Sequence, residues 1–179
     1  MNRLVGDLLL LARADAGRAG TRSECDLAAI AEEALEELRP IADGHALESS
    51  LDGEALVRGN ADELHRMVLN LLENAIRHTP EGTTVRLEVG SVEGLARLEV
   101  SDDGPGLPEG MEQEIFGRFV RAKGPADRSQ RSGTGLGLAI VRAVARGHGG
   151  DVEAHNDDGA HFTVTLPAAE KFERTIASA

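Results

Sequence analysis

The sequence has few aromatic residues and almost no cysteine. Its 179 residues include four Phe, no Trp, no Tyr and a single cysteine, Cys25. A core must therefore be built from aliphatic side chains, and an internal disulfide or a cysteine-rich metal site is excluded. The net charge of −12 also argues against nucleic acid as a partner, because nucleic-acid-binding proteins need a basic surface and usually aromatic rings that stack on bases.

The sequence also lacks a long hydrophobic run. The longest aliphatic stretch, Leu8–Leu11, is too short to cross a bilayer, and charges flank it too closely for a signal peptide. Leu4, Leu8 and Leu11 share one stripe of a predicted helix over residues 1–16. Residues 17–25 are polar and contain glycine, which predicts a linker.

Beyond this linker, helical and strand patterns follow one another along the chain. Apolar residues at helical spacing predict helices over residues 26–44, 61–79 and 136–150, and a short helical piece is predicted over residues 112–120. The residues Asn60-Ala-Asp-Glu63 resemble a capping box that opens the second of these helices. Alternating residues predict strands over residues 45–51, 54–60, 83–89, 95–104 and 151–167, the last interrupted by an Asp-Gly turn. There is no regular βαβ alternation, which favours an α+β fold. We expect a two-layer α/β sandwich whose mixed, mostly antiparallel sheet carries helices on one face.

The helix that includes NLLENAIRHTP (residues 70–80) carries two asparagines near one face. Asn70 and Asn74 are spaced i, i+4 and flank a stripe of apolar residues. Asparagine is a mediocre helix former, so a pair at this spacing needs a reason. Amide oxygens are hard ligands that suit Mg²⁺, which takes its other ligands from water and phosphates. For this helix alone, two solvated boundary residues are an equally good interpretation.

A second segment, SDDGPGLP (residues 101–108), directly follows a predicted strand. Asp102 lies at the strand end, where its carboxylate could accept a hydrogen bond from an adenine amino group. Gly104 and Gly106 let the backbone come close to a flat ligand. Taken alone, the segment is better explained as an ordinary Asp-Gly turn.

A third segment, SGTGLGLAIV (residues 132–141), places Gly133, Gly135 and Gly137 just before a predicted helix. Exposed N–H groups at a helix N-terminus bind anions. The segment is not a P-loop, because no Gly-Lys-Ser/Thr follows, and it is not a dinucleotide fingerprint, because no strand leads into it. A lone glycine-rich turn is weak evidence for a ligand.

Together and in this order, the three segments resemble the ATP-binding catalytic domain of sensor histidine kinases, within the superfamily of gyrase, Hsp90 and MutL ATPases. NLLENAIRHTP is similar to the N box, DDGPG to the first glycine box, EIFGRFVR to the F box and GTGLGL to the second glycine box. HGG and FTVTLP complete the pattern. The resemblance covers residues 26–167. Residues 1–16 resemble the end of the second helix of the dimerisation domain, and residues 168–179 are predicted to be a frayed tail.

The resemblance implies the Bergerat fold, with ATP and Mg²⁺ as cofactors. Asn70 and Asn74 would hold Mg²⁺ and phosphates, Arg77 would reach a phosphate and His78 would lie against the nucleotide. The adenine amino group would bind Asp102 in a pocket shaped by Gly104 and Gly106, and the second glycine box would wrap the phosphates through Gly133, Thr134, Gly135, Leu136 and Gly137. Residues 107–132 would form a lid, from which a phosphate would be contacted by Arg118 or Arg121.

The sequence contains no histidine in the context that surrounds the phosphoacceptor histidine of this family. None of the six histidines is followed by an acidic residue and, four residues later, by proline, as the acceptor of the family is. We therefore expect either a fragment or a subunit that acts on another chain, and the truncated helix at residue 1 favours a fragment. The implied partners are ATP or ADP, the dimerisation domain of a homodimeric kinase and a response regulator. The resemblance also implies a cytoplasmic domain of a kinase in the cell membrane.

Other functions of the same superfamily stay open. A clamp-type ATPase has a glutamate one helical turn before the metal-binding asparagine to activate water, and here Asn70, which cannot take a proton, holds that place. A serine kinase that switches off a sigma factor would share the fold, but the dimerisation-like residues 1–16 argue against it. An inactive binding module is disfavoured by intact Asn74, Asp102 and glycine boxes.

Overall fold

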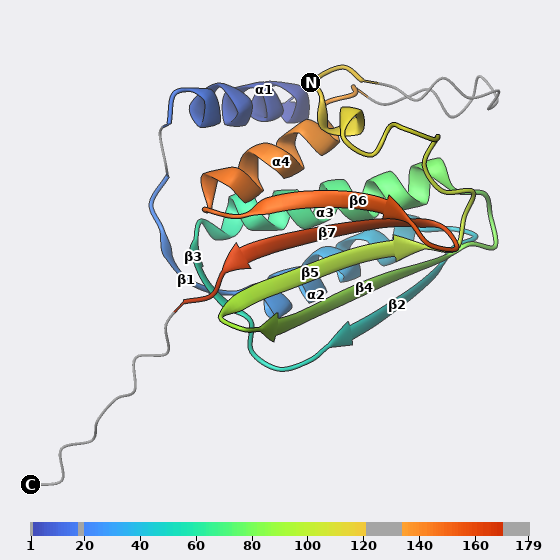
Figure 1. Ribbon diagram of the computed structural model, residues 1–179, viewed down its shortest axis with the longest axis horizontal. Coiled ribbons are helices and arrows are strands. Elements are labelled where there is room, and N and C mark those ends of the chain that lie inside the picture. The colour runs from blue at the N-terminus through green and yellow to red at the C-terminus, as the bar shows by residue number, and fades with distance from the viewer. Residues whose placement is uncertain (1, 18–19, 121–133, 170–179) are drawn as a thin grey trace, which may run out of the picture.

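The computed structural model describes residues 2–17, 20–120 and 134–169 (Figure 1). The main sheet has five strands in the order β2-β4-β5-β7-β6. Strand β2 pairs with β4 in parallel, and the other three pairs are antiparallel. This confirms the predicted mixed, mostly antiparallel sheet. In chain order the strands are β2 (Ala46–Leu51), β4 (Thr84–Val92), β5 (Leu95–Asp102), β6 (Asp151–Asn156) and β7 (Ala160–Pro167).

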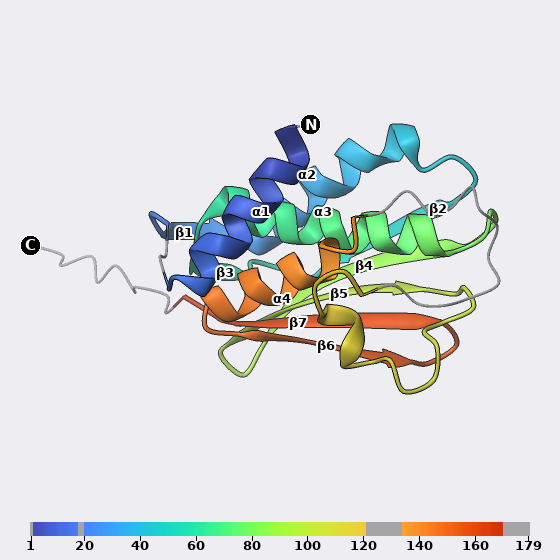
Figure 2. The same cartoon turned by 90° about the horizontal axis from the view of Figure 1, so that it is seen from above.

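Three helices cover one face of this sheet, as predicted (Figure 2). They are α2 (Leu27–Leu38), α3 (Ala61–His78) and α4 (Gly137–Gly147). The short strands β1 (Ser23–Asp26) and β3 (Leu56–Gly59) form a separate antiparallel pair at one end. Helix α1 (Asn2–Asp15) lies on α4, on the side of the helical layer that faces away from the sheet. In the described residues no helix is both long and apolar enough to cross a membrane.

The core lies between the helical layer and the sheet. Alternate residues of β4 and β5 point inward, and the apolar stripe of α3 packs toward them, which is why the two sequence periods predicted the layers correctly. Half of the predicted capping box at the start of α3 is present: the side chain of Asn60 accepts a hydrogen bond from the backbone N–H of Glu63 at 3.0 Å, but the N–H of Asn60 donates to His148 rather than to Glu63. Fully buried residues from these elements include Leu64, Met67, Leu71, Leu72, Val85, Leu87, Leu98 and Val100.

Two helical predictions were too long. Helix α2 ends at Leu38 rather than Gly44, and a short 3₁₀ helix, η1 (Arg39–Ile41), follows it. Pro40 explains the early end, because it has no N–H to donate to a carbonyl one turn earlier and so cannot continue the α-helix. The helical piece predicted at residues 112–120 is only a 3₁₀ turn, η2 (Glu114–Phe116), after which Gly117 is extended.

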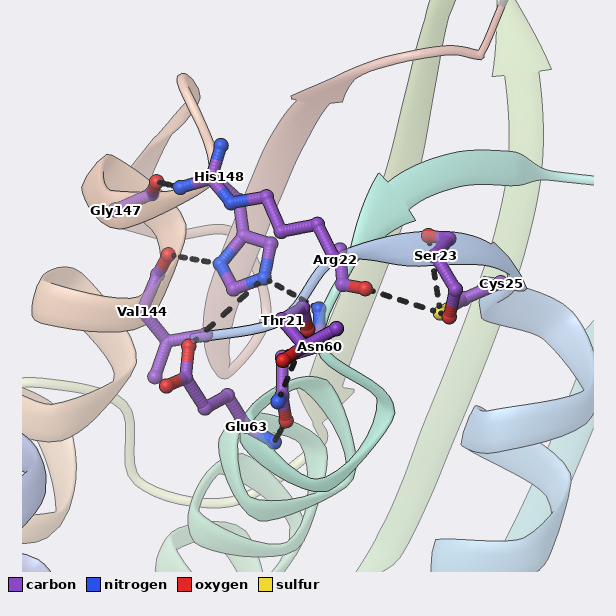
Figure 3. A network of polar contacts seen from close by, with 10 residues as sticks. Thr21, Arg22, Ser23, Cys25, Asn60, Glu63, Val144, Gly147 and His148 are labelled. Carbon is purple, nitrogen blue, oxygen red and sulfur yellow. Dashed lines mark hydrogen bonds and ion pairs between the residues drawn. The ribbon is translucent and has the colours of Figure 1, made fainter. Parts of the chain in front are cut away.

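A polar network joins the end of the linker segment to two helices (Figure 3). The ring of His148, at the end of α4, donates from Nδ1 to the carbonyl of Val144 at 2.8 Å and accepts at Nε2 from the N–H of Asn60 at 3.1 Å. Asn60 also donates to the carbonyl of Thr21, and Arg22 donates to the carbonyl of the last residue of α4. His148 is therefore a buried structural residue in a neutral tautomer.

Both ends of the domain formed by residues 26–167 pair with β3. Strand β1 runs antiparallel to β3, so the last residues of the predicted linker belong to a strand. At the other end, Ala168 forms a bridge with Val57, and the N–H of Ala169 donates to Leu56 at 2.7 Å. The first residues of the predicted frayed tail are thus hydrogen-bonded, and residues 170–179 lie outside the described residues.

Candidate nucleotide-binding site

Asn70 is a buried amide with an unused donor. The residue is 6% exposed, and its Nδ2 makes no hydrogen bond within the described part of the chain. Asn74, one turn later on α3, is half-buried. A buried polar group without a partner destabilises a fold by about 1–3 kcal/mol, so a buried amide in this state indicates a place for a ligand.

The N-terminus of α4 lies beside Asn70. A Cβ atom built on Gly137, the first residue of α4, would lie 3.4 Å from Oδ1 of Asn70. Among the residues that the structure describes, no side chain caps this helix end. The first N–H groups of a helix have no partner inside the helix and favour an anion. Asn70 and the start of α4 therefore make a polar pocket suited to phosphate.

The turn that leads into α4 requires glycine at Gly135. Its φ of +69° is left-handed, and an added Cβ would lie 3.0 Å from the Cα of Phe119. The N–H of Phe119 donates to the carbonyl of Gly135 at 2.8 Å. Leu136 is buried and Thr134 is exposed, with its Oγ1 3.4 Å from the N–H of Leu136. Gly133 lies outside the described residues.

Asp102, the last residue of β5, is 5% exposed. Its Oδ1 accepts hydrogen bonds from the N–H of Gly104 at 3.0 Å and of Ala160 at 3.4 Å. Burial raises the pKa of the carboxyl, and these two amides oppose that effect. A Cβ on Gly104 would lie 2.6 Å from Cγ2 of Thr79, so only glycine fits between α3 and β5. The fold fixes one oxygen of Asp102 and leaves Oδ2 for a ligand.

The end of α3 brings the N box next to the first glycine box. Arg77 and His78 are exposed there. Burial of part of the ring and the charge of Arg77 lower the pKa of His78, while the carboxylate of Asp102 opposes them. His78 thus lies within electrostatic reach of Asp102 and is predominantly neutral at neutral pH. A neutral imidazole at this position can stack on a ring or hydrogen-bond to it.

Asn156 also contributes to this region and was not predicted from the sequence. Its Oδ1 accepts from the N–H of Leu107 at 2.7 Å, and its Nδ2 donates to the carbonyl of Leu107 at 2.9 Å. Gly106 has a φ of +74°, and a Cβ there would lie 2.8 Å from Oδ1 of Asn156. An asparagine before an Asp-Asp-Gly turn is ordinary in sequence, so no local signal distinguishes it.

The described part of the predicted lid is anchored to the core. Ile115 and Phe116 are buried, and the ring of Phe116 meets that of Phe162 edge-on, with centroids 6.3 Å apart. Arg118 forms an ion pair with Asp15 of α1 at 2.6 Å, so its guanidinium is held against α1. Arg121 and the rest of the predicted lid, to residue 132, lie outside the described residues.

Comparison with known proteins identifies the family. Residues 59–170, from the end of β3 to just past β7, match the family described as histidine kinase-, DNA gyrase B- and HSP90-like ATPase. The chain belongs to this ATPase family. The matched range contains every described residue of the predicted site.

Relatives of this ATPase domain are sensor histidine kinases. The chain is 42% identical over 170 residues to the probable sensor histidine kinase TcrY of Mycobacterium tuberculosis, covering 93% of this chain and 35% of TcrY. It is 37% identical over 169 residues to the sensor protein KdpD of Escherichia coli, covering 92% of this chain and 18% of KdpD. The chain thus spans about a third or less of these two relatives.

Solved structures give the same result for the fold. The mycobacterial sensor histidine kinase MprB matches with a TM-score of 0.73 and 29% identity, over 83% of this chain and 98% of that one. Full-length ShkA, solved in complex with AMPPNP, matches with a TM-score of 0.79 and 27% identity, over 93% of this chain and 35% of that one. These matches confirm the predicted fold and the resemblance to histidine kinase catalytic domains.

Proposed function

We propose that this domain binds Mg²⁺-ATP and presents its γ-phosphate to a histidine on the dimerisation domain of a sensor kinase. The observation that supports ATP binding best is the unpaired, buried Nδ2 of Asn70 beside the uncapped start of α4. The buried carboxylate of Asp102 lies at the other end of the site and supplies an acceptor for the adenine amino group. An anion site and an acceptor for a base together fit a nucleotide.

The two asparagines of α3 suit the metal that accompanies the triphosphate. The amide oxygens of Asn70 and Asn74 are the hard ligands that Mg²⁺ accepts, and the unused amide of Asn70 fits a ligand at this point. Bound Mg²⁺-ATP would supply the transferable phosphoryl group. The chain would orient it with the N–H groups at the start of α4, and Arg77 would bind a phosphate from the open side.

We infer that the nucleophile comes from another domain, because four of the six histidines are held by contacts within the fold and none of the six lies in an acceptor pattern. His148 is buried and hydrogen-bonded at both ring nitrogens. His161 binds Glu99 at 2.8 Å and stacks on His155. His45 contacts the hydroxyl of Thr79 at 2.9 Å. This supports an acceptor on a dimerisation domain, in agreement with the histidine kinase names of the relatives.

We assign residues 1–16 to the second helix of that dimerisation domain and residues 26–167 to the ATP-binding domain. Support comes from α1, which packs on the domain with Leu11 buried but leaves an apolar surface exposed. In a two-helix dimerisation domain such a surface would face other helices. The assignment implies a homodimeric kinase, with a response regulator as the final phosphoryl acceptor and with this domain on the cytoplasmic side of the membrane. The exposed residues are Leu4, Val5, Leu8 and Leu9.

The test is incubation of the chain with γ-labelled ATP, with and without a dimerisation domain that carries the acceptor histidine. We expect ATP binding in both cases, very slow turnover by the chain alone, and acid-labile label on the added domain. Asn74→Ala should abolish labelling because it removes a metal ligand. A matched control is Glu153→Gln, an exposed change on β6 away from the site.

Two results would replace the proposal. Brisk phosphate release by the isolated chain would indicate a clamp-type ATPase, although Asn70 stands where such an enzyme has its general base. General-base help contributes about 10²–10⁴ in rate, so its lack should leave ATP nearly inert. Acid-stable label on an added protein would instead indicate a serine kinase.

A further inference from the structure

The turn between β6 and β7 contacts both ends of the first glycine box. At one end, the N–H of Ala160 donates to Oδ1 of Asp102. Gly159 lies so close to the strand that an added Cβ would be 1.7 Å from the carbonyl oxygen of Asp102. At the other end, the side chain of Asn156 bonds to both the N–H and the carbonyl of Leu107. The turn therefore touches the segment from Asp102 to Leu107 at its first and last residues.

The opposite side of this segment is fixed by β4. The N–H of Thr84 donates to Oδ1 of Asp103 at 2.7 Å, and the N–H of Asp103 donates to the carbonyl of Thr84 at 3.3 Å. The start of the segment is thus held from two sides. The end of the segment is held by the side chain of Asn156. This side chain binds the N–H and the carbonyl of Leu107, which are the two groups that a neighbouring strand would otherwise bind.

We propose that Asn156 is a positioning residue for recognition of the adenine base, which rests on the function proposed above. It does not touch the base. It fixes the path of the backbone from Gly104 to Leu107, and so fixes where the wall of the base pocket lies relative to the carboxylate of Asp102. A side-chain amide supplies one acceptor and one donor, which here bind the N–H and the carbonyl of one residue, Leu107.

The exposure of Asn156 makes the idea testable without unfolding the protein. Asn156 lies at the surface, so its removal leaves no large cavity and no buried group unpaired. Asn156→Ala should loosen the end of the segment while the core beneath stays intact. The result to look for is a loss of discrimination between bases, since a residue with a merely structural role would lower the affinity for all nucleotides alike.

The experiment measures binding of ATP and of inosine triphosphate to the full chain by calorimetry, for the wild type, Asn156→Ala and the control Glu153→Gln. Inosine triphosphate has the same triphosphate but lacks the 6-amino group that Asp102 would accept. We expect Asn156→Ala to weaken ATP about fivefold, or about 1 kcal/mol, with little change for inosine triphosphate, so that the preference for ATP narrows. Hydrogen exchange of the Leu107 amide should also become faster in the nucleotide-free protein.

The outcomes separate this inference from the proposed function. If the wild type binds ATP and Asn156→Ala keeps both the affinity and the preference, the positioning role is overturned and the function stands. An equal loss for both nucleotides would reduce Asn156 to a structural residue. If the wild type does not bind ATP, the proposed function fails, and the positioning role with it. Faster hydrogen exchange of the Leu107 amide with unchanged nucleotide binding would show that Asn156 holds this backbone, but it would overturn the proposed role of Asn156 in recognition of the base.

Discussion

The two ends of the candidate site are built in opposite ways. At the adenine end, the segment from Asp102 to Leu107 is hydrogen-bonded to β4 on one side and to the β6–β7 turn on the other. At the end proposed to bind phosphate, the described residues give the buried donor of Asn70 no partner and the start of α4 no side-chain cap. The backbone of the first end is held by hydrogen bonds within the fold, whereas the second end has a buried donor that no described residue satisfies.

This difference would suit the proposed binding and release of a nucleotide. A pre-formed base pocket requires little ordering when the ligand binds, so it favours affinity and selectivity. Unpaired amides at the phosphate end make the ligand-free protein less stable, and binding removes that penalty.

Gly159→Ala should break the adenine end most severely. A Cβ there would meet the carbonyl oxygen of Asp102 at 1.7 Å, and φ is +138°. We expect the free energy of unfolding to fall by about 3 kcal/mol or more, since both strain and overlap with backbone are introduced. Urea denaturation measures the effect. The control is Gly147→Ala at the end of α4, where an added Cβ meets nothing within 4 Å, and a loss of similar size there would refute this explanation.

Asn70→Leu should separate stability from binding at the phosphate end. The change replaces an unpaired buried amide with an apolar side chain of similar size, so the free energy of unfolding should rise by about 1 kcal/mol. Affinity for Mg²⁺-ATP should fall by roughly 100-fold or more, equivalent to about 2.7 kcal/mol. Urea denaturation and calorimetry give the two values. A clear loss of stability would mean that Asn70 has a structural partner.

Asp102→Asn should weaken ATP by roughly tenfold, because a hydrogen bond to a charged acceptor contributes about 1.5–3 kcal/mol. The same change should raise, rather than lower, the free energy of unfolding at pH 7. Burial raises the pKa of Asp102, so the folded protein favours the protonated carboxyl, and wild-type stability from this group falls as pH rises through that pKa. The variant should therefore gain stability relative to the wild type at pH 7 and lose that advantage in acid. Denaturation at pH 7 and in acid shows whether the variant is more stable than the wild type at pH 7 and loses this advantage in acid.

Glu99→Gln should have the smallest effect. Glu99 lies on β5, on the face of the sheet that the helices do not cover. Burial is the largest single effect and opposes charge on both Glu99 and His161. Their mutual hydrogen bond and attraction, together with the other nearby polar and charged groups, outweigh it, so the pKa of Glu99 is lowered and that of His161 is raised. The pair therefore stabilises most between the ordinary values of 4.5 and 6.5 and weakens in more acidic and more alkaline solution. Denaturation at pH 5.5 and pH 8.5 should show a difference from the wild type, under about 1 kcal/mol, that is larger at pH 5.5. A difference in stability that is the same at pH 5.5 and pH 8.5 would contradict the ion pair between Glu99 and His161.

Local pattern was enough to predict most of the architecture. The helical stripe of α3, its cap at Asn60 and the alternation in β4 and β5 each reflect forces between residues a few positions apart, which the sequence displays directly. Where the pattern was overruled, the cause was also local: Pro40 ended α2 early and Gly117 limited η2 to one turn. The three motifs of the candidate site were likewise visible, because each needs particular residue types at short spacing.

Contacts between distant segments could be decided only by the tertiary structure. The bond from Asn156 to Leu107 spans 49 positions, and that from Arg118 to Asp15 spans 103. Neither has a local signature, since an exposed asparagine beside a turn and an arginine in a loop fit many surroundings. The same holds for the unpaired amide of Asn70, whose burial depends on how α4 packs against α3. Short-range periodicity therefore determined the elements and motifs of this protein, whereas the packing of the layers determined which polar groups are braced and which are left for a ligand.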